Sequence, residues 1–309
     1  MSSDAHVPVL LGPVLDGLNI KGSGCYVDGT FGRGGHSSAI LERLTANGRL
    51  IAIDRDPQAI ESAPQALLQD PRFELIRGEC AQLEKFIDAR GLRGRVDGVL
   101  FDLGVSSPQL DEAGRGFSFL RDGPLDMRMD PGAGISAADW LAGVDEKELK
   151  RVLKTYGEER FAARIARAIV SARDEAPIRR TGQLATIIAD AVPVHADKIH
   201  PATRSFQAIR IVINDELEQL RAALEQSMNV LRRGGRLCVI SFHSLEDRLV
   251  KRFMREASRE SEQYRGMPSV PPEHRPKLAV IGKLIEATAE EVAGNRRARS
   301  ARLRVAERL

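Results

Sequence analysis

The chain has 309 residues, of which 42% are hydrophobic and 29% charged, with a net charge of +3. This length predicts about two domains with a substantial buried core. We find no stretch of the roughly 18 apolar residues that a membrane span requires, and no signal-peptide pattern among the first residues. The three cysteines, Cys25, Cys80 and Cys238, are far apart in sequence, which predicts reduced thiols. We therefore expect a cytoplasmic protein without membrane association.

The first hundred residues alternate short apolar runs with helical periodicities, a pattern typical of βαβ units and a parallel sheet. Four strands are predicted, at residues 24–28, 49–54, 73–76 and 96–102. The helices between them are predicted at residues 37–46, 57–68 and 81–89.

From residue 107 to residue 213 the sequence shows turns and helical periodicities but no convincing buried parallel strand. Residues 114–134 are rich in Gly, Pro and Asp and predict a long ordered loop, which is uncommon unless functional. Further helices are predicted at residues 137–141, 146–156, 158–173 and 182–191. This stretch is predicted to be an inserted helical domain.

The alternation of strands and helices resumes after the insertion. We predict a helix at residues 215–231, a turn at Gly234-Gly235 and a strand at 236–242. Strands at 277–283 and 301–306 would complete the sheet with an antiparallel last strand. The predicted fold class is α/β and Rossmann-like, with a discontinuous domain of residues 1–106 and 214–309 and an inserted domain of residues 107–213.

Basic side chains form three clusters. Each cluster alone is typical of a solvated face, but together they favour a partner with a phosphate backbone. In the first cluster the arginines share one face of a predicted helix beside an apolar stripe of Phe161, Ile165, Ala168 and Ile169. The clusters are Arg160, Arg164 and Arg167; Arg248, Lys251, Arg252 and Arg255; and Arg296, Arg297, Arg299, Arg302 and Arg304.

The first predicted strand runs into a glycine-rich turn, DGTFGRGGHS, at residues 28–37. Glycines allow close approach of a ligand to the backbone, and the following helix start offers unpaired N–H donors. The second strand ends at Asp54, close to the spacing of about 20 residues at which an acidic side chain reaches a ribose diol. These features predict a nucleoside ligand, with a helix N-cap as the alternative role of Asp54.

Two kinds of nucleoside compete for this turn. The dinucleotide pattern would begin at Gly32 and Gly34, but its third position is Ser37. Asp28 would repel a pyrophosphate, whereas S-adenosylmethionine carries an ammonium and a sulfonium group. S-adenosylmethionine is therefore favoured, and NAD remains the alternative. The fourth strand ends in the polar loop DLGVSSPQLD from Asp102, which should face the ligand because open α/β sheets bind at the carboxyl ends of their strands.

Seven groups of motifs, in order and at natural spacings, cover nearly the whole chain. On these motifs the chain resembles the family of ribosomal RNA small subunit methyltransferase H, also called MraW. The motifs are YVDGTFGRGGHS from Tyr26, DLGVSSPQLD from Asp102, GFSF and DGPLDMRMD within residues 116–130, YGEERFA from Tyr156, HPATRSFQAIRIVIN from His200, GGRLCVISFHSLEDR from Gly234 and the terminal NRRARSARLRVAER.

The resemblance implies a class I methyltransferase that transfers a methyl group from S-adenosylmethionine to N4 of a cytosine. The implied target lies in the decoding region of 16S rRNA, within the assembled small ribosomal subunit. Carried over by position, the implied cofactor contacts are Gly34, Gly35, His36, Asp54, Cys80, Asp102 and Gln109. Cys80 departs from the family pattern, in which an aromatic residue is common, so ring stacking on the adenine is not expected there.

A cytosine amine is a poor nucleophile, so we expect positioning and hydrogen bonding to dominate catalysis. The predicted acceptors for its hydrogens are Asp102 and the turn formed by Ser106, Ser107 and Pro108. Phe117 and Phe119 could stack on the target base, with core packing as the alternative. No metal ion is expected.

The predicted RNA contacts lie mainly in the inserted domain. Arg160, Arg164 and Arg204 are expected on phosphates, while Arg204 and Arg210 could equally form helix caps or salt bridges with Asp215 and Glu216. His243 is expected either to hydrogen-bond the base or to hold a loop. Three other functions stay open at this point: a DNA amino-methyltransferase, an NAD-dependent oxidoreductase and a non-catalytic assembly factor. A homodimer also stays open.

Overall fold

The computed structural model describes residues 8–193, 200–260, 262–264, 271 and 274–309. The chain divides into two compact units, which we describe separately. The first comprises Met1–Gly104 and Leu217–Leu309, and the second comprises Val105–Glu216. In the described ranges we find no helix with the length and apolar character needed to cross a bilayer.

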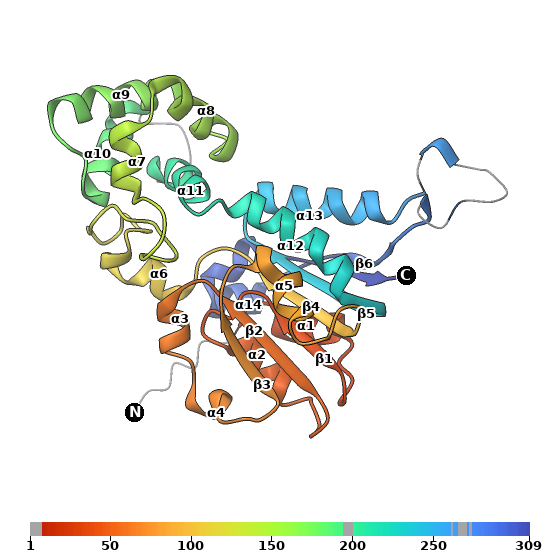
Figure 1. Cartoon of the computed structure of the whole chain (residues 1–309). Helices are drawn as coiled ribbons and strands as arrows, with labels where there is room; N and C mark the ends of the chain where they lie inside the picture. Colours follow the sequence, from red (N-terminus) through yellow and green to blue (C-terminus); the bar gives the residue numbers. More distant parts are fainter. Residues whose placement is uncertain (1–7, 194–199, 261, 265–270, 272–273) are drawn as a thin grey trace. The chain divides into compact units, whose positions relative to one another are not determined.

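Within the described residues, the first unit contains a seven-stranded sheet with strand order β3-β2-β1-β4-β5-β7-β6 (Figure 1). Strands β1 to β5 are parallel, and β7 runs antiparallel to its neighbours β5 and β6. The predicted mostly parallel sheet with an antiparallel last strand is therefore confirmed. The strands are β1 Cys25–Asp28, β2 Arg49–Asp54, β3 Phe73–Arg77, β4 Val96–Asp102, β5 Leu231–Ser241, β6 Leu278–Glu286 and β7 Arg302–Arg308.

Helices cover both faces of the sheet, which explains the continuous apolar runs of the central strands. In β2, for example, Leu50, Ile51 and Ile53 are all fully buried. One face packs against α1 Leu11–Leu18, α2 Gly35–Leu41, α4 Gln65–Leu68 and α14 Ala289–Gly294. The other packs against α5 Leu83–Asp88, α12 Glu216–Val230 and α13 Ser244–Ala257.

Two element predictions for the first unit are wrong. The single helix expected at residues 57–68 is two short helices, α3 Pro57–Glu61 and α4, because Pro64 lacks an amide hydrogen and disfavours helix at the preceding residue. The strand expected at 236–242 begins earlier, at Leu231. The Gly234-Gly235 pair lies within β5, opposite a register shift between Val96 and Gly98, and Gly234 has a φ of 75°. Residues 232–235 therefore lie opposite residue 97 alone, and the predicted Gly234-Gly235 turn falls inside the strand instead of before it.

The second unit is helical and has its own apolar core, formed by residues such as Leu149, Val152, Ile188 and Ile209. Helices α7 and α8 begin at side-chain caps from Ser136 and Asp145. The helices are α6 Ser107–Asp111, α7 Ala137–Gly143, α8 Glu146–Tyr156, α9 Ala162–Glu175, α10 Thr181–Ala191 and α11 Ala202–Ile213.

The helix expected at residues 158–173 begins four residues later than predicted. Glu158 has a φ of 49°, in the left-handed region, so the helix cannot include it and α9 starts after Phe161. The buried face of α9 also differs slightly from the predicted stripe, because Ala166 is buried in place of Ala168.

Candidate functional site

The tips of three neighbouring strands bring the predicted cofactor residues of the first unit to one edge of the sheet. In the register of β1 with its neighbours, Asp28 pairs with Ala52 of β2 and with Leu100 of β4. Asp54 and Asp102 each lie two residues beyond those partners, so they flank the turn that follows β1. The acidic ends of β2 and β4 therefore lie on either side of the glycine turn.

The shape of this turn depends on Gly34. Its φ of 75° is in the left-handed region, and a Cβ atom there would lie 2.7 Å from the ring of Phe31. Gly35 begins α2, so the amides of Gly35 and His36 belong to a helix start that has no earlier partners within the helix. The turn is tied to β2 because the amide of Gly32 donates to Oδ2 of Asp54 at 2.7 Å.

Asp54 is held by two backbone amides and is not the cap of the following helix. Its second oxygen, Oδ1, accepts from the amide of Asp56 at 2.9 Å. The helix α3 is capped instead by Asp56, which accepts from the amide of Gln58 at 3.0 Å. Burial raises the pKa of Asp54 to about 6, although both amide hydrogen bonds lower it. Each carboxylate oxygen retains a lone pair that a ribose hydroxyl can use.

A buried polar cluster lies under the turn. Asp28 is 1% exposed, and its carboxylate accepts from the Ser37 hydroxyl at 2.7 Å and from the Thr30 amide at 3.1 Å. Burial raises the pKa of Asp28 despite these hydrogen bonds. The hydroxyl of Thr30 in turn accepts from the amide of Asp102 at 2.6 Å, so the cluster joins the ends of β1 and β4.

His36 approaches Asp102 directly. Its Nε2 lies 3.5 Å from Oδ2 of Asp102, with the imidazole 6% and the carboxylate 27% exposed. Burial disfavours a charged imidazole, but the carboxylates of Asp102 and Asp28 outweigh it and raise the pKa of His36. His36 therefore has a side-chain neighbour in β4 as well as its place in the glycine turn.

Cys80 begins the short helix η1 Cys80–Gln82 after β3. Its Sγ lies 4.0 Å from the carbonyl oxygen of Gln219. Burial raises the pKa of the thiol to about 11, so the side chain is neutral at physiological pH. A small neutral thiol can make van der Waals contact with an adenine but supplies no aromatic ring.

The polar loop after β4 continues into the second unit. Ser106 precedes α6, and its amide donates to Oε1 of Gln109 at 2.9 Å, a capping interaction that keeps Gln109 5% exposed. Ser107 and Pro108 form the first turn of α6. Asp102 belongs to the first unit, so its cooperation with these residues remains a prediction.

Phe117 and Phe119 are engaged in packing within the second unit. Phe117 is 6% exposed, and the guanidinium carbon of Arg115 lies 5.8 Å from its ring centre. The Phe119 ring stacks on His200 with centroids 4.4 Å apart and meets Phe206 edge-on at 5.0 Å. These contacts support the packing alternative, and stacking on a base remains a prediction.

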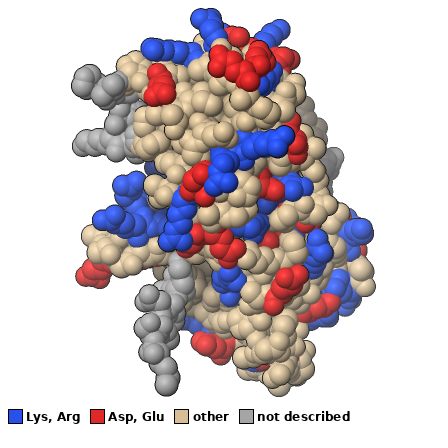
Figure 2. Space-filling view, turned by 90° about the vertical axis from the view of Figure 1, so that its left-hand side faces the viewer, with Lys and Arg blue, Asp and Glu red and all other residues tan. Residues whose placement is uncertain are grey.

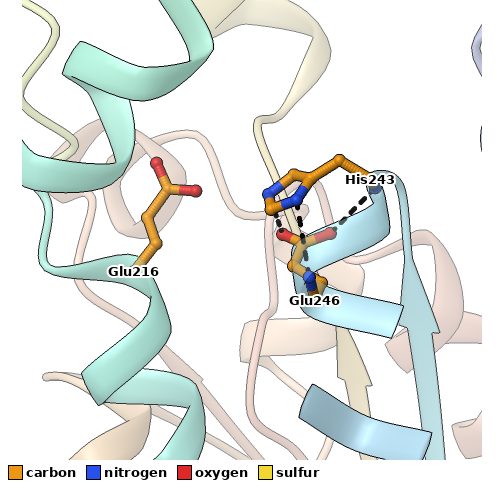
Figure 3. Close-up of side chains that lie close together, drawn as sticks. All are labelled: Glu216, His243 and Glu246. Carbon is orange, nitrogen blue, oxygen red and sulfur yellow. Dashed lines mark hydrogen bonds and ion pairs between the residues drawn. The ribbon is translucent and has the colours of Figure 1, made fainter. Parts of the chain in front are cut away.

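His243 holds the turn from β5 into α13 (Figure 3). Its Nδ1 accepts from the amide of Glu246 at 3.4 Å, and its Nε2 lies 3.1 Å from Oε1 of the same residue. Oε2 of Glu246 accepts from the amide of Phe242 at 2.8 Å. This reciprocal cap is the loop-holding role expected as one alternative for His243.

The predicted RNA-contacting arginines have different surroundings. Arg160 and Arg164 are exposed, whereas Arg204 of α11 is half-buried. Arg210 forms a bidentate ion pair with Glu216, at 2.7 and 2.8 Å, which is one of the alternatives considered for it. Figure 2 shows basic and acidic side chains interspersed over one face of the molecule. Phosphate binding to this surface would therefore depend on individual exposed basic side chains and not on the net charge of the protein.

Asn214 is a buried structural residue that the sequence did not single out. It is 1% exposed, and its amide group donates to the carbonyl oxygen of Met127 at 2.7 Å and accepts from the amide of Met129 at 2.7 Å. Met127 has a φ of 62° and Arg115 donates to the carbonyl oxygen of Met129 at 2.9 Å. The end of α11 thus fixes the loop of residues 114–134.

The fold and the edge residues define the class of protein. A mixed sheet of this strand order, with β7 antiparallel and an acidic residue at the tip of β2 beside a glycine turn, is that of a class I S-adenosylmethionine-dependent methyltransferase. Residues 3–309 match the model of the MraW methylase family, so the chain belongs to that family. It is an S-adenosylmethionine-dependent methyltransferase that acts on N4 of a cytosine in 16S rRNA.

The chain has low similarity to several solved structures. A Clostridium thermocellum protein provisionally described as an rRNA methylase is 15% identical, with a TM-score of 0.46, over 98% of this chain and 100% of its own. An rRNA methylase from Streptococcus thermophilus is 13% identical, with a TM-score of 0.42, over 96% of this chain and 95% of its own. TrmN from Thermus thermophilus is 12% identical, with a TM-score of 0.44, over 97% of this chain and 48% of its own. These distant likenesses add nothing to the family assignment.

Proposed function

We propose that S-adenosylmethionine lies along the edge formed by the tips of β1, β2 and β4, with its methyl group toward Asp102. The observation that carries this proposal is the position of Asp54 and Asp102 on either side of the Gly34 turn. Gly34, Gly35 and His36 would contact the ligand through the turn, Asp54 would accept from its ribose, and Cys80 would border its adenine. The carboxylates suit a ligand that carries an ammonium and a sulfonium group.

Asp102 would act on the substrate amine. The bound donor supplies a sulfonium methyl group that is already activated for attack. The carboxylate of Asp102 accepts hydrogen bonds from the cytosine amine, which localises the nitrogen lone pair as that nitrogen becomes tetrahedral. Transfer would form the C–N bond as the donor's C–S bond breaks, with the bonding electrons remaining on sulfur, and the methylated amine would release one proton to water. Ser106, Ser107 and Pro108 would provide further acceptors in this step.

The second unit would recognise the RNA. Exposed Arg160 and Arg164, with Arg204, would contact phosphates, which position a substrate without reading its sequence. Phe117, Phe119 and His243 would border the target base, and Gln109 would border the cofactor. Under this proposal the domain that binds S-adenosylmethionine comprises residues 1–106 and 214–309, and the substrate domain comprises residues 107–213.

The substrate within 16S rRNA would be the decoding region of the assembled small subunit. An unpaired, splayed base gives access to N4 and is the usual target of sequence-specific RNA recognition. A substrate of this kind places the enzyme in the cytoplasm. Sedimentation of the purified protein at micromolar concentration would decide between a monomer and a homodimer.

Two substitutions test the site by separating binding from transfer. Asp54→Ala should weaken S-adenosylmethionine binding by about 1.5–3 kcal/mol, the range for hydrogen bonds to charged groups. Asp102→Ala should abolish methyl transfer to small subunits while binding remains measurable by calorimetry. Glu61→Ala, an exposed carboxylate of the same unit, serves as the matched control. Wild-type transfer by Asp102→Ala, or wild-type binding by Asp54→Ala, would disprove the proposed site.

A further inference from the structure

His36 is buried at the point where the proposed methyl transfer occurs, and its imidazole has a directed neighbour. Its Nε2 faces Oδ2 of Asp102 at 3.5 Å. The segment before α1 lies against the start of α2, because the carbonyl of Val9 faces the imidazole and a Cβ atom at Gly35 would lie 2.5 Å from Pro8. Glu291 of α14 fixes that segment by accepting from the amide of Leu10 at 2.6 Å.

The two oxygens of Asp102 have different surroundings. Oδ2 faces the imidazole, whereas Oδ1 and both ring nitrogens of His36 are buried without a hydrogen-bond partner among the described residues. Buried polar atoms without a partner are costly, which favours a closer pairing of Nε2 with Oδ2 than the 3.5 Å of this structure. The backbone of Asp102 is fixed as well, because its amide donates to the Thr30 hydroxyl at 2.6 Å.

We propose that His36 is a positioning residue for methyl transfer: its imidazole holds Oδ2 of Asp102 and so fixes the rotation of the carboxylate that meets the amine of the target cytosine. This inference rests on the proposed role of Asp102. His36 takes no proton from the substrate in this account. It fixes the rotation of the carboxylate and balances its negative charge.

The groups around the imidazole favour its charged form. Asp102 approaches from β4 and Asp28 from β1, the carbonyl of Val9 lies on the side of α1, and Ser37 in its own helix donates to Asp28. Although burial lowers it, the carboxylates and the Val9 carbonyl together raise the pKa of His36 above its usual value of 6.5. The charged imidazole therefore persists to a higher pH than that of a free histidine and is lost as the pH rises further.

If His36 had only a structural role, it would fill space under the turn, and its replacement would change only the stability or the cofactor affinity. The positioning role predicts a change in kcat and in its pH dependence. Two variants separate these cases. His36→Leu removes every donor, whereas His36→Gln retains a neutral donor that can reach Asp102 but cannot titrate.

The experiment measures kcat, the KM for S-adenosylmethionine and their pH profiles on purified small subunits. His36→Leu should lower kcat by about 10- to 100-fold, the loss expected when a hydrogen bond to a charged group is removed, with KM changed less than about 3-fold. His36→Gln should restore most of kcat and lose the decline that the wild-type profile shows with rising pH. Glu42→Gln, an exposed position at the end of the same helix, is the matched control with wild-type behaviour.

Three results overturn the inference: wild-type kcat in His36→Leu, a shift in KM alone, or an unchanged decline of kcat with rising pH in His36→Gln. If His36→Leu does not fold, the pH profile of His36→Gln still decides. Asp102→Asn distinguishes this failure from that of the proposed function. Loss of transfer in Asp102→Asn beside normal His36 variants rejects only the positioning role, whereas normal transfer in Asp102→Asn rejects the role of Asp102 itself.

Discussion

The raised pKa of Asp54 makes binding of S-adenosylmethionine depend on pH. A ribose hydroxyl donates to the ionised carboxylate, so the ligand should bind the ionised form of the site better than the protonated form. With a pKa of about 6, the carboxylate is roughly 90% ionised at pH 7 and roughly 10% ionised at pH 5. The affinity should therefore fall about 10-fold between these values, which corresponds to about 1.4 kcal/mol.

Calorimetric titration between pH 5 and pH 8 tests this prediction. The wild-type dissociation constant should rise below pH 6, and S-adenosylhomocysteine, which shares the ribose but lacks the sulfonium charge, should show the same dependence. Asp54→Asn should bind more weakly at pH 7 and show no such dependence. A wild-type affinity that does not change from pH 7 to pH 5, or the same decline in Asp54→Asn, would refute the assignment of Asp54 to the ribose.

The same shift should affect stability in the absence of ligand. The folded-state pKa of Asp54 lies above the ordinary value of 3.8, so the contribution of Asp54 to the free energy of unfolding is fully present below pH 3.8 and is lost as the pH rises through about 6. Urea unfolding of the ligand-free proteins should therefore show that Asp54→Asn loses less stability than the wild type over this pH interval. Gly34→Ala should destabilise the protein by about 1–2 kcal/mol, measured by urea unfolding, because its φ of 75° is unfavourable for a residue with a Cβ atom. Asn214→Ala should lower the free energy of unfolding by about 1–3 kcal/mol, because it leaves buried backbone groups unpaired. Transfer assays on this variant should show a reduced kcat with unchanged cofactor affinity. Replacing the exposed arginines of the α9 region, Arg160, Arg164 and Arg167, by glutamine should make the salt dependence of rRNA binding shallower. The slope of the logarithm of the binding constant against the logarithm of the salt concentration should decrease by about 0.7–0.9 for each phosphate that is no longer neutralised. The same replacement of the exposed lysines of α8, Lys147, Lys150 and Lys154, is the control and should leave this slope unchanged.

The sheet was predictable from sequence because its central strands are buried on both faces and form continuous apolar runs. Once the ends of β2 and β4 are known, Asp54 and Asp102 must lie beside the turn after β1, since parallel strands place their carboxyl ends at one edge. Local chemistry also explains the errors. Pro64 was present in the sequence as a helix breaker, and the part of β5 before Gly234 cannot be recognised when its pairing partner in β4 is unknown.

Contacts between distant parts of the sequence could not be predicted in the same way. Asn214 reaches Met127 and Met129 over more than 80 positions, and no local pattern indicates that pairing. The approach of His36 to Asp102 depends on how the turn after β1 packs against the end of β4. The packing of Phe119 on His200 and Phe206 likewise depends on the tertiary structure of the second unit.

The most direct test of the account is nucleoside mass spectrometry of 16S rRNA. Small subunits from cells that lack the protein would be incubated with S-adenosylmethionine and either wild-type enzyme or Asp102→Ala. The account predicts N4-methylcytosine at one cytosine of the decoding region with the wild type and none with the variant. The same modified nucleoside in untreated subunits, or its formation by Asp102→Ala, would contradict it.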